Sequence, residues 1–272
     1  MTTLVRPREG RPALDGPYEG VPDFLRRSLT RWLENVYTVK PDTWTPDMDE
    51  AGLDRLAALL RIDLRGTDGY GMLSGIFAWA GEDDERLLDV IHYTLRVPTR
   101  MPKMWHELEI LLAYGGSIWA ATGKGLQRRV DETAMEAFNA ATAGPDNASD
   151  HLALAWAGAY GRVPHPASAW HHSIKALEAS LRNVVSPNKA SATLSDVIDE
   201  LRTGNWKLEL RGQARDYTID PLLQMLELVW PDPNRRRSDE PEPPATTEEA
   251  QAVVQLAVAI VQWARDSQIA RK

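Results

Sequence analysis

Three histidines lie close together in the second half of the chain, at His165, His171 and His172. Imidazole exchanges a proton readily near neutral pH, so the adjacent His171 and His172 are the candidate catalytic residues. Two neighbouring side chains on a helix point in diverging directions and do not converge on one metal ion, so no metal site is predicted. The alternative is that His171 is a solvated surface residue without a chemical role.

An arginine cluster, Arg235, Arg236 and Arg237, is the strongest local basic feature. Each guanidinium presents a planar fork of donors that suits a phosphate group, which makes the cluster a candidate RNA contact. The acidic, proline-rich run SDEPEPP follows it directly, and the alternative is a self-neutralising surface loop. Arg100 and His106 are a weaker candidate pair for acting on RNA. Their spacing is expected by chance about once in a chain of this composition.

Composition limits the chemistry further. The chain has no cysteine, which excludes disulfides, thiolate metal sites and thiol nucleophiles. It contains neither a GxxxxGK[ST] phosphate loop nor a GxSxG nucleophile motif, and we predict no cofactor. The 39 acidic residues outnumber the 31 basic ones, for a net charge of −8. Any contact with RNA must therefore come from a local basic patch.

The N-terminal sequence MTTLVRPREGRPALDG lacks the apolar core that a signal peptide requires. The longest apolar run, Ala252 to Trp263, is interrupted by Gln255 and Gln262 and is too short to span a bilayer. These features predict a soluble, cytoplasmic protein with no membrane partner.

Apolar residues recur at steps of three and four along most of the chain, which predicts an all-α, multi-helical bundle. The expected helices cover residues 21–36, 53–60, 73–79, 87–97, 104–114, 131–143, 168–185, 193–203 and 221–229, followed by a last helix that begins after Thr246. Asp131 is expected to cap one helix, and Thr246 with Glu249 forms a capping-box pattern. The last helix is apolar on nearly all sides, so it is expected at the centre of its domain or in a subunit interface.

At most one or two short β-hairpins are expected beside the helices. The first is Ser117 to Val130, with Gly123 and Gly125 at its turn. A second extended pair is expected between residues 206–210 and 214–217. The glycine-rich stretch after Asp68 is expected to loosen the chain before the helix at 73–79.

Three parts are predicted along the chain. Residues 1–20 form a flexible arm, residues 21–145 an N-terminal helical domain, and residues 146–272 a C-terminal helical domain, with the boundary at the turn Gly144-Pro145-Asp146. The ten tryptophans are expected to be mainly large apolar anchors in the core.

The helix at 168–185 carries two distinct faces. Its expected apolar face consists of Trp170, Ile174, Leu177, Leu181 and Val184, and a polar stripe beside it consists of His171, Lys175, Glu178 and Arg182. The helix is therefore expected to face the core and to present His171 away from it.

The stretch AYGRVPHPASAWHHSIKALEASLRNVVSPNKASATLSDVIDELR, together with LLQMLELVWPDPNRR and EEAQAVVQLAVAIVQWA, resembles the C-terminal domain of abortive-infection-type proteins, which are related to the HEPN superfamily. The resemblance covers residues 149–272, and residues 116–130 look like the lead-in to such domains. It implies an all-helical domain, often paired across a two-fold interface, that acts on RNA in phage defence.

The resemblance also implies a basic element followed by His-Gly between the last two helices. Here Arg235, Arg236 and Arg237 match the basic part, whereas Ser238 and Asp239 replace His-Gly. The expected function is a phage-defence protein with a HEPN-like domain that is RNA-directed and degenerate in catalysis. A homodimer is expected, with RNA and a phage or host protein as partners. The alternative is a non-enzymatic interaction or scaffold protein that uses tryptophans at its surface.

Overall fold

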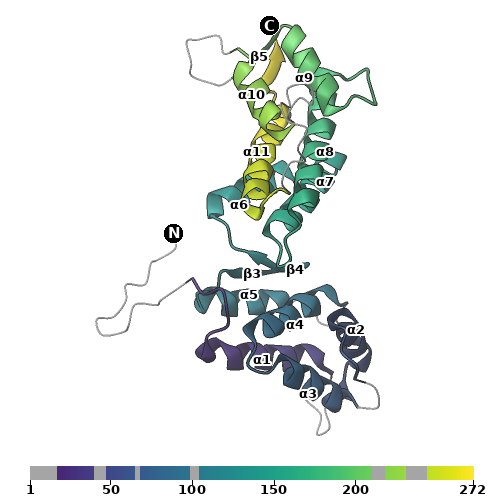
Figure 1. The fold of residues 1–272 in the computed structure, drawn as a ribbon, viewed down its shortest axis with the longest axis vertical. Helices are drawn as coiled ribbons and strands as arrows, with labels where there is room; N and C mark the ends of the chain where they lie inside the picture. Colours follow the sequence, from purple (N-terminus) through teal and green to yellow (C-terminus); the bar gives the residue numbers. More distant parts are fainter. Residues whose placement is uncertain (1–16, 40–46, 65–67, 99–103, 210–217, 231–243) are drawn as a thin grey trace, which may run out of the picture. The chain divides into compact units, whose positions relative to one another are not determined.

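The computed structural model describes residues 17–39, 47–64, 68–98, 104–209, 218–230 and 244–272. This part of the chain is 66% helical, with eleven helices and three two-stranded sheets, which confirms the predicted all-α class. The chain divides into two compact units, residues 1–129 and 130–272, and each is described separately (Figure 1).

In its described residues, the N-terminal unit contains five helices and two small antiparallel sheets (Figure 1). In chain order its elements are α1 (Asp23–Tyr37), β1 (Thr38–Val39), β2 (Asp47–Met48), α2 (Glu50–Leu60), α3 (Gly69–Ala80), α4 (Asp84–Arg96), α5 (Met104–Tyr114), β3 (Trp119–Thr122) and β4 (Gly125–Arg128). The hydrophobic core of this unit gathers leucines from all five helices around Tyr37 and Ile76, which are fully buried.

The hairpin predicted at residues 117–130 is confirmed as β3 and β4, with Thr122 opposite Gly125. It lies on α4 because the buried His92 accepts a hydrogen bond at Nδ1 from the backbone N–H of Leu126, at 3.1 Å. Gly125 has a φ of 131°, and a Cβ there would lie 2.7 Å from the His92 ring. Only glycine allows this close approach. Residues 17–20 of the predicted arm pack beside the hairpin, where Tyr18 bridges Ser117.

Helix α3 begins earlier than the sequence predicted. Asp68 caps it by accepting from the N–H of Gly71, at 2.8 Å, so the glycine-rich stretch is helical. Close packing explains the glycines, because a Cβ on Gly69 would lie 2.5 Å from the Cβ of Met48. Tertiary contact therefore overrides the low helix propensity of glycine here.

Over the ranges that the structure describes, the C-terminal unit contains six helices and one two-stranded sheet (Figure 1). Its elements are α6 (Glu132–Ala141), α7 (Asn147–Tyr160), α8 (Pro166–Val185), α9 (Leu194–Thr203), β5 (Trp206–Leu208), α10 (Asp220–Val229), α11 (Thr247–Arg265) and β6 (Ile269–Arg271). The predicted caps are confirmed: Asp131 caps α6, and Thr246 with Glu249 forms a capping box at α11.

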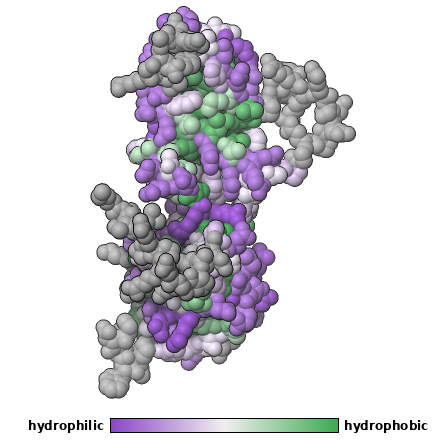
Figure 2. All heavy atoms as spheres, turned by 90° about the vertical axis from the view of Figure 1, so that its left-hand side faces the viewer, coloured by the Kyte–Doolittle hydropathy of each residue, from purple (hydrophilic) through white to green (hydrophobic). Residues whose placement is uncertain are grey.

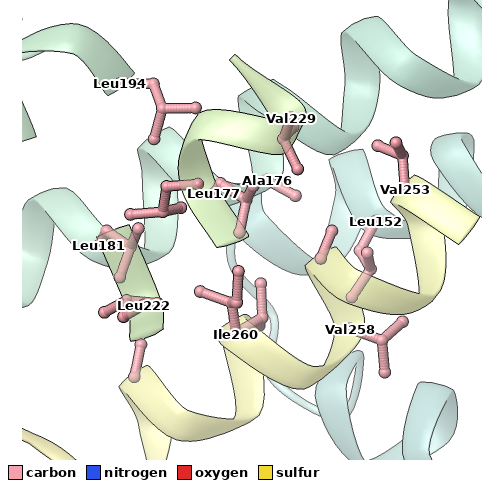
Figure 3. Packing of buried hydrophobic residues seen from close by; sticks show 14 of the residues in the cluster. Leu152, Ala176, Leu177, Leu181, Leu194, Leu222, Val229, Val253, Val258 and Ile260 are labelled. Carbon is pink, nitrogen blue, oxygen red and sulfur yellow. The ribbon is translucent and has the colours of Figure 1, made fainter. Parts of the chain in front are cut away.

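The last helix, α11, packs along α7 and α8, and α6 also covers it. Figure 3 shows Val258 and Ile260 of α11 among leucines of α7, α8 and α10. One side of α11 still reaches the surface, at Ala252 and Gln255. Figure 2 shows hydrophobic side chains on the face of this unit over α10 and α11. Leu228 of α10 is 71% exposed.

The boundary between the units lies at residues 129 and 130, before the predicted turn Gly144-Pro145-Asp146. Helix α6 belongs to the C-terminal unit because Gln262 of α11 donates a hydrogen bond to the carbonyl of Ala137, at 2.9 Å. The turn itself is fixed inside that unit, since Arg265 binds both carboxylate oxygens of Asp146, at 2.8 and 2.9 Å.

Strand β5 forms where an extended segment was predicted, but it pairs with the C-terminal residues Ile269–Arg271. The predicted partner, residues 214–217, lies outside the described residues. Among the tryptophans that the structure describes, Trp32, Trp119, Trp156 and Trp206 are buried and only Trp230, at 37%, counts as exposed. Across the described ranges, every helix is too short or too polar for a transmembrane span.

Candidate functional site: a histidine pair on the α7–α8 hairpin

Helices α7 and α8 form a tight antiparallel hairpin that positions the predicted histidines. The turn closes where the N–H of His165 donates to the carbonyl of Gly158, at 2.8 Å, and His165 is the N-cap residue of α8. The two helices approach closely at Gly158, where a Cβ would lie 3.2 Å from the Cβ of Ala169. The side chains of residues 171 and 172 therefore lie in the first half of α8, beside α7.

His172 faces a histidine from the neighbouring helix, His151 of α7. Their Nδ1 atoms are 3.1 Å apart, which is a hydrogen-bond distance. The ring planes differ by 24° and the ring centroids are 5.3 Å apart. The ring centroids are farther apart than the two Nδ1 atoms, by almost twice the distance between a ring centroid and its Nδ1. This difference arises only when each Nδ1 lies on the side of its ring that faces the other ring. The two Nδ1 atoms therefore point at one another.

This contact fixes complementary tautomers in the neutral pair. One Nδ1 carries the hydrogen and donates, and the other Nδ1 accepts. The ring that donates leaves its Nε2 with a lone pair, which is a base. The ring that accepts carries its hydrogen on Nε2, which is an acid. The His151–His172 pair thus presents one proton acceptor and one proton donor on the far sides of its rings.

Burial favours the neutral form of His172. The pKa of His172 is lowered below its usual 6.5, first by desolvation and then by repulsion from His151 and His171. Both rings of the pair are half-buried, while His171 is exposed and its ring centroid lies 5.5 Å from that of His172. The lowered pKa favours a neutral His172 at neutral pH, the state in which its free ring nitrogen can take up a proton.

The predicted residues His171 and His172 are neighbours on α8, with ring planes 70° apart, and the structure adds His151, which the sequence reasoning missed. His151 lies 21 residues before His172 and on a different helix. Nothing in the local pattern marks it. The turn with Pro164 and Pro166 was the sequence signal that could have led to His151. Two helices joined by a short turn must pack side by side, which brings residues of the first helix next to those of the second.

Arg235, Arg236 and Arg237 lie outside the described residues, as does Arg100. The described chain on both sides of the arginine segment is attached near the α7–α8 turn. Before it, the carbonyl of Val229 accepts from the indole N–H of Trp170, at 2.9 Å. After it, Gln251 of α11 donates to the carbonyl of Ala159, at 3.2 Å. Both attachment points lie close to the helix segment that carries the histidines.

His106, the other histidine considered from the sequence, is exposed on α5 in the N-terminal unit, with its ring 4.9 Å from that of Trp105. Within the described ranges, no group of three or more His, Asp or Glu side chains is placed to hold a metal ion. When the chain is compared with models of protein families, with curated proteins and with solved structures, none of them matches.

Proposed function

We propose that this chain is an abortive-infection-type phage-defence protein, acting in the cytoplasm, whose HEPN-like C-terminal unit binds and cleaves RNA. The observation that supports this most is the hydrogen-bonded pair His151–His172, because its complementary tautomers leave one Nε2 free to accept a proton. Ser238 and Asp239 replace the His-Gly element expected from the resemblance. In this proposal the histidines of α7 and α8 carry the proton chemistry instead.

The proposed reaction is an internal transfer at the RNA backbone. The bare Nε2 of the pair takes the proton from a ribose 2′-hydroxyl, and the 2′-oxygen forms a bond to the adjacent phosphorus. The bond from phosphorus to the 5′-oxygen breaks, and a water molecule protonates that oxygen. The hydroxide left behind takes the proton that the pair received. The products are a 2′,3′-cyclic phosphate and a 5′-hydroxyl. Arg235, Arg236 and Arg237 bind the phosphate and stabilise its developing charge.

The arginine assignment predicts the effect of the double substitution Arg235→Ala and Arg236→Ala. We expect it to weaken binding of single-stranded RNA and to reduce the salt dependence of binding, because each lost phosphate contact releases about 0.7 fewer counterions. Fluorescence anisotropy at several salt concentrations measures both. The matched control is Lys189→Ala with Arg202→Ala, which removes two exposed charges from elsewhere in the same unit. Equal binding and cleavage of RNA by the Arg235→Ala, Arg236→Ala variant and the parent would contradict the assignment.

The proposed homodimer has a candidate surface in the same unit, the apolar face over α10 and α11 (Figure 2). Leu228 on this face is 71% exposed, and an exposed apolar face of this kind is suited to burial against a second copy of the chain. Leu228→Glu is therefore expected to halve the mass measured by light scattering. Asn183→Glu places the same charge at an exposed position of α8, away from α10 and α11, and should leave the dimer intact. A monomeric parent protein, or a dimeric Leu228→Glu variant, would count against this surface.

The alternative, a scaffold protein that binds partners through surface tryptophans, now has few residues to use. Among the tryptophans in the described ranges, Trp230 is the one that qualifies as exposed. An interaction that uses an indole would therefore centre on the end of α10. Loss of a partner from Trp230→Ala, with RNA binding unchanged, would favour the alternative over the RNA proposal.

A further inference from the structure

The N-terminal unit has a hollow between α1 and α5 that the RNA proposal does not use. Its volume is about 560 Å³, and it is lined by Arg27, Ser28, Arg31, Trp32, Asn35, Glu107 and Leu111. The two helices run antiparallel, because the indole of Trp32 donates to the carbonyl of Met104, at 2.9 Å, while Leu25 packs against Gly115. The volume lies within the range of small-molecule sites.

Two arginines form one wall of this hollow. Arg27 and Arg31 are one helical turn apart on α1, so they lie on the same face, and both are exposed. Within the described part of the chain, neither makes a hydrogen bond or an ion pair. Their neighbour Arg26 behaves differently, since it binds the carbonyls of Gly81 and Glu82, each at 3.2 Å, and the carboxylate of Asp84.

Two like charges held one turn apart repel each other, and no carboxylate within ion-pair distance in the described residues offsets this repulsion. The nearest acidic side chains do not bind them. Glu107 lines the same hollow without an ion pair, and Asp23 and Glu34 line a second hollow that the two arginines also border. The arginine forks therefore remain available to an anion that enters beside α5. Guanidinium forks match phosphate in geometry as well as in charge.

The rest of the lining suits hydroxyl groups. The carboxylate of Glu107 accepts hydrogen bonds, the hydroxyl of Ser28 donates and accepts, and the amide of Asn35 does both. None of the three has a partner among the described side chains. Leu111 and the edge of Trp32 add an apolar surface. With two cations and one anion, the lining carries a net charge of +1, in a chain whose net charge is −8.

We propose that the α1–α5 hollow binds a small phosphorylated sugar ligand of nucleotide size. Arg27 and Arg31 hold its phosphate, and Glu107 with Asn35 receives the sugar hydroxyls. The proposal concerns the N-terminal unit alone and does not depend on RNA cleavage by the C-terminal unit.

Isothermal titration calorimetry of the full chain tests this proposal with AMP, ribose 5-phosphate, adenosine and inorganic phosphate as probes. AMP and ribose 5-phosphate are expected to bind, and at least tenfold more tightly than adenosine or inorganic phosphate. Arg27→Ala with Arg31→Ala is expected to weaken AMP binding at least tenfold. Lys124→Ala, an exposed lysine at the hairpin turn of the same unit, should leave it unchanged. Added salt should weaken binding, because the phosphate contact is exposed.

Several results would overturn the proposal. One is a parent protein that binds neither AMP nor ribose 5-phosphate. Another is equal affinity for AMP in the parent and in the Arg27→Ala, Arg31→Ala variant. Adenosine or inorganic phosphate binding as tightly as AMP would also refute it, because one of the two recognised groups would then contribute nothing. Both arginines are exposed, so circular dichroism is expected to show an unchanged fold in the double variant.

Discussion

Replacing His172 with alanine is expected to lower the rate of RNA cleavage by at least about a hundredfold, the usual lower range for loss of a general acid or base. The change removes one ring of the pair and releases His151 from its fixed tautomer. The measurement is cleavage of a labelled single-stranded RNA under single-turnover conditions. The pH profile gives a second readout. Because the pKa of His172 lies below 6.5, cleavage by the parent should persist at mildly acidic pH and fall only when His172 becomes protonated.

The matched control for His172 is His165→Ala. His165 is exposed in the turn before α8, and its side chain makes no capping hydrogen bond there. The His165→Ala substitution therefore removes an imidazole from the same region without changing the His151–His172 pair. The variant should cleave RNA at the same rate as the parent. The account fails if His172→Ala cleaves as fast as the parent, or if both substitutions reduce cleavage equally.

Leu177→Ala is expected to lower the free energy of unfolding by about 2–5 kcal/mol, because it leaves a cavity in a closely packed core. Leu177 is fully buried on α8, the helix with the most contacts in its unit (Figure 3). Urea denaturation followed by circular dichroism measures the loss. Leu154→Ala makes the same chemical change on α7, where the side chain is 51% exposed, and is expected to cost less than about 1 kcal/mol. Equal losses for the two variants would contradict the described packing.

The sequence predicted elements well where local signals coincide. Helix α5 has the predicted bounds, Met104–Tyr114, because an apolar period ends at two glycines. The caps at Asp131 and Thr246 formed as expected, since each satisfies backbone donors within three residues. On α8 the pattern identified the buried Leu177 and Leu181. It left out small residues such as Ala176 and Ser180, which are buried because α8 packs on more than one neighbour.

The remaining features depend on contacts between residues distant in the chain, and periodicity carries no information on such contacts. Strand β6 lies at the C-terminus and pairs with Trp206–Leu208 across the unit, with Arg271 packed over the Trp206 ring at 5.0 Å. Phe24 fits the apolar period of α1, yet it is 59% exposed. The His151–His172 contact is of the same kind, because it exists only once two helices have packed together.

The most direct test of the RNA proposal is ultraviolet cross-linking of the full chain to a uridine-rich RNA, with the cross-linked peptides mapped by mass spectrometry. The proposal predicts cross-links in the first half of α8, around His171 and His172, and in the segment that contains Arg235, Arg236 and Arg237. Cross-links confined to the N-terminal unit, or none above a bovine serum albumin control, would contradict RNA as the ligand of the C-terminal unit.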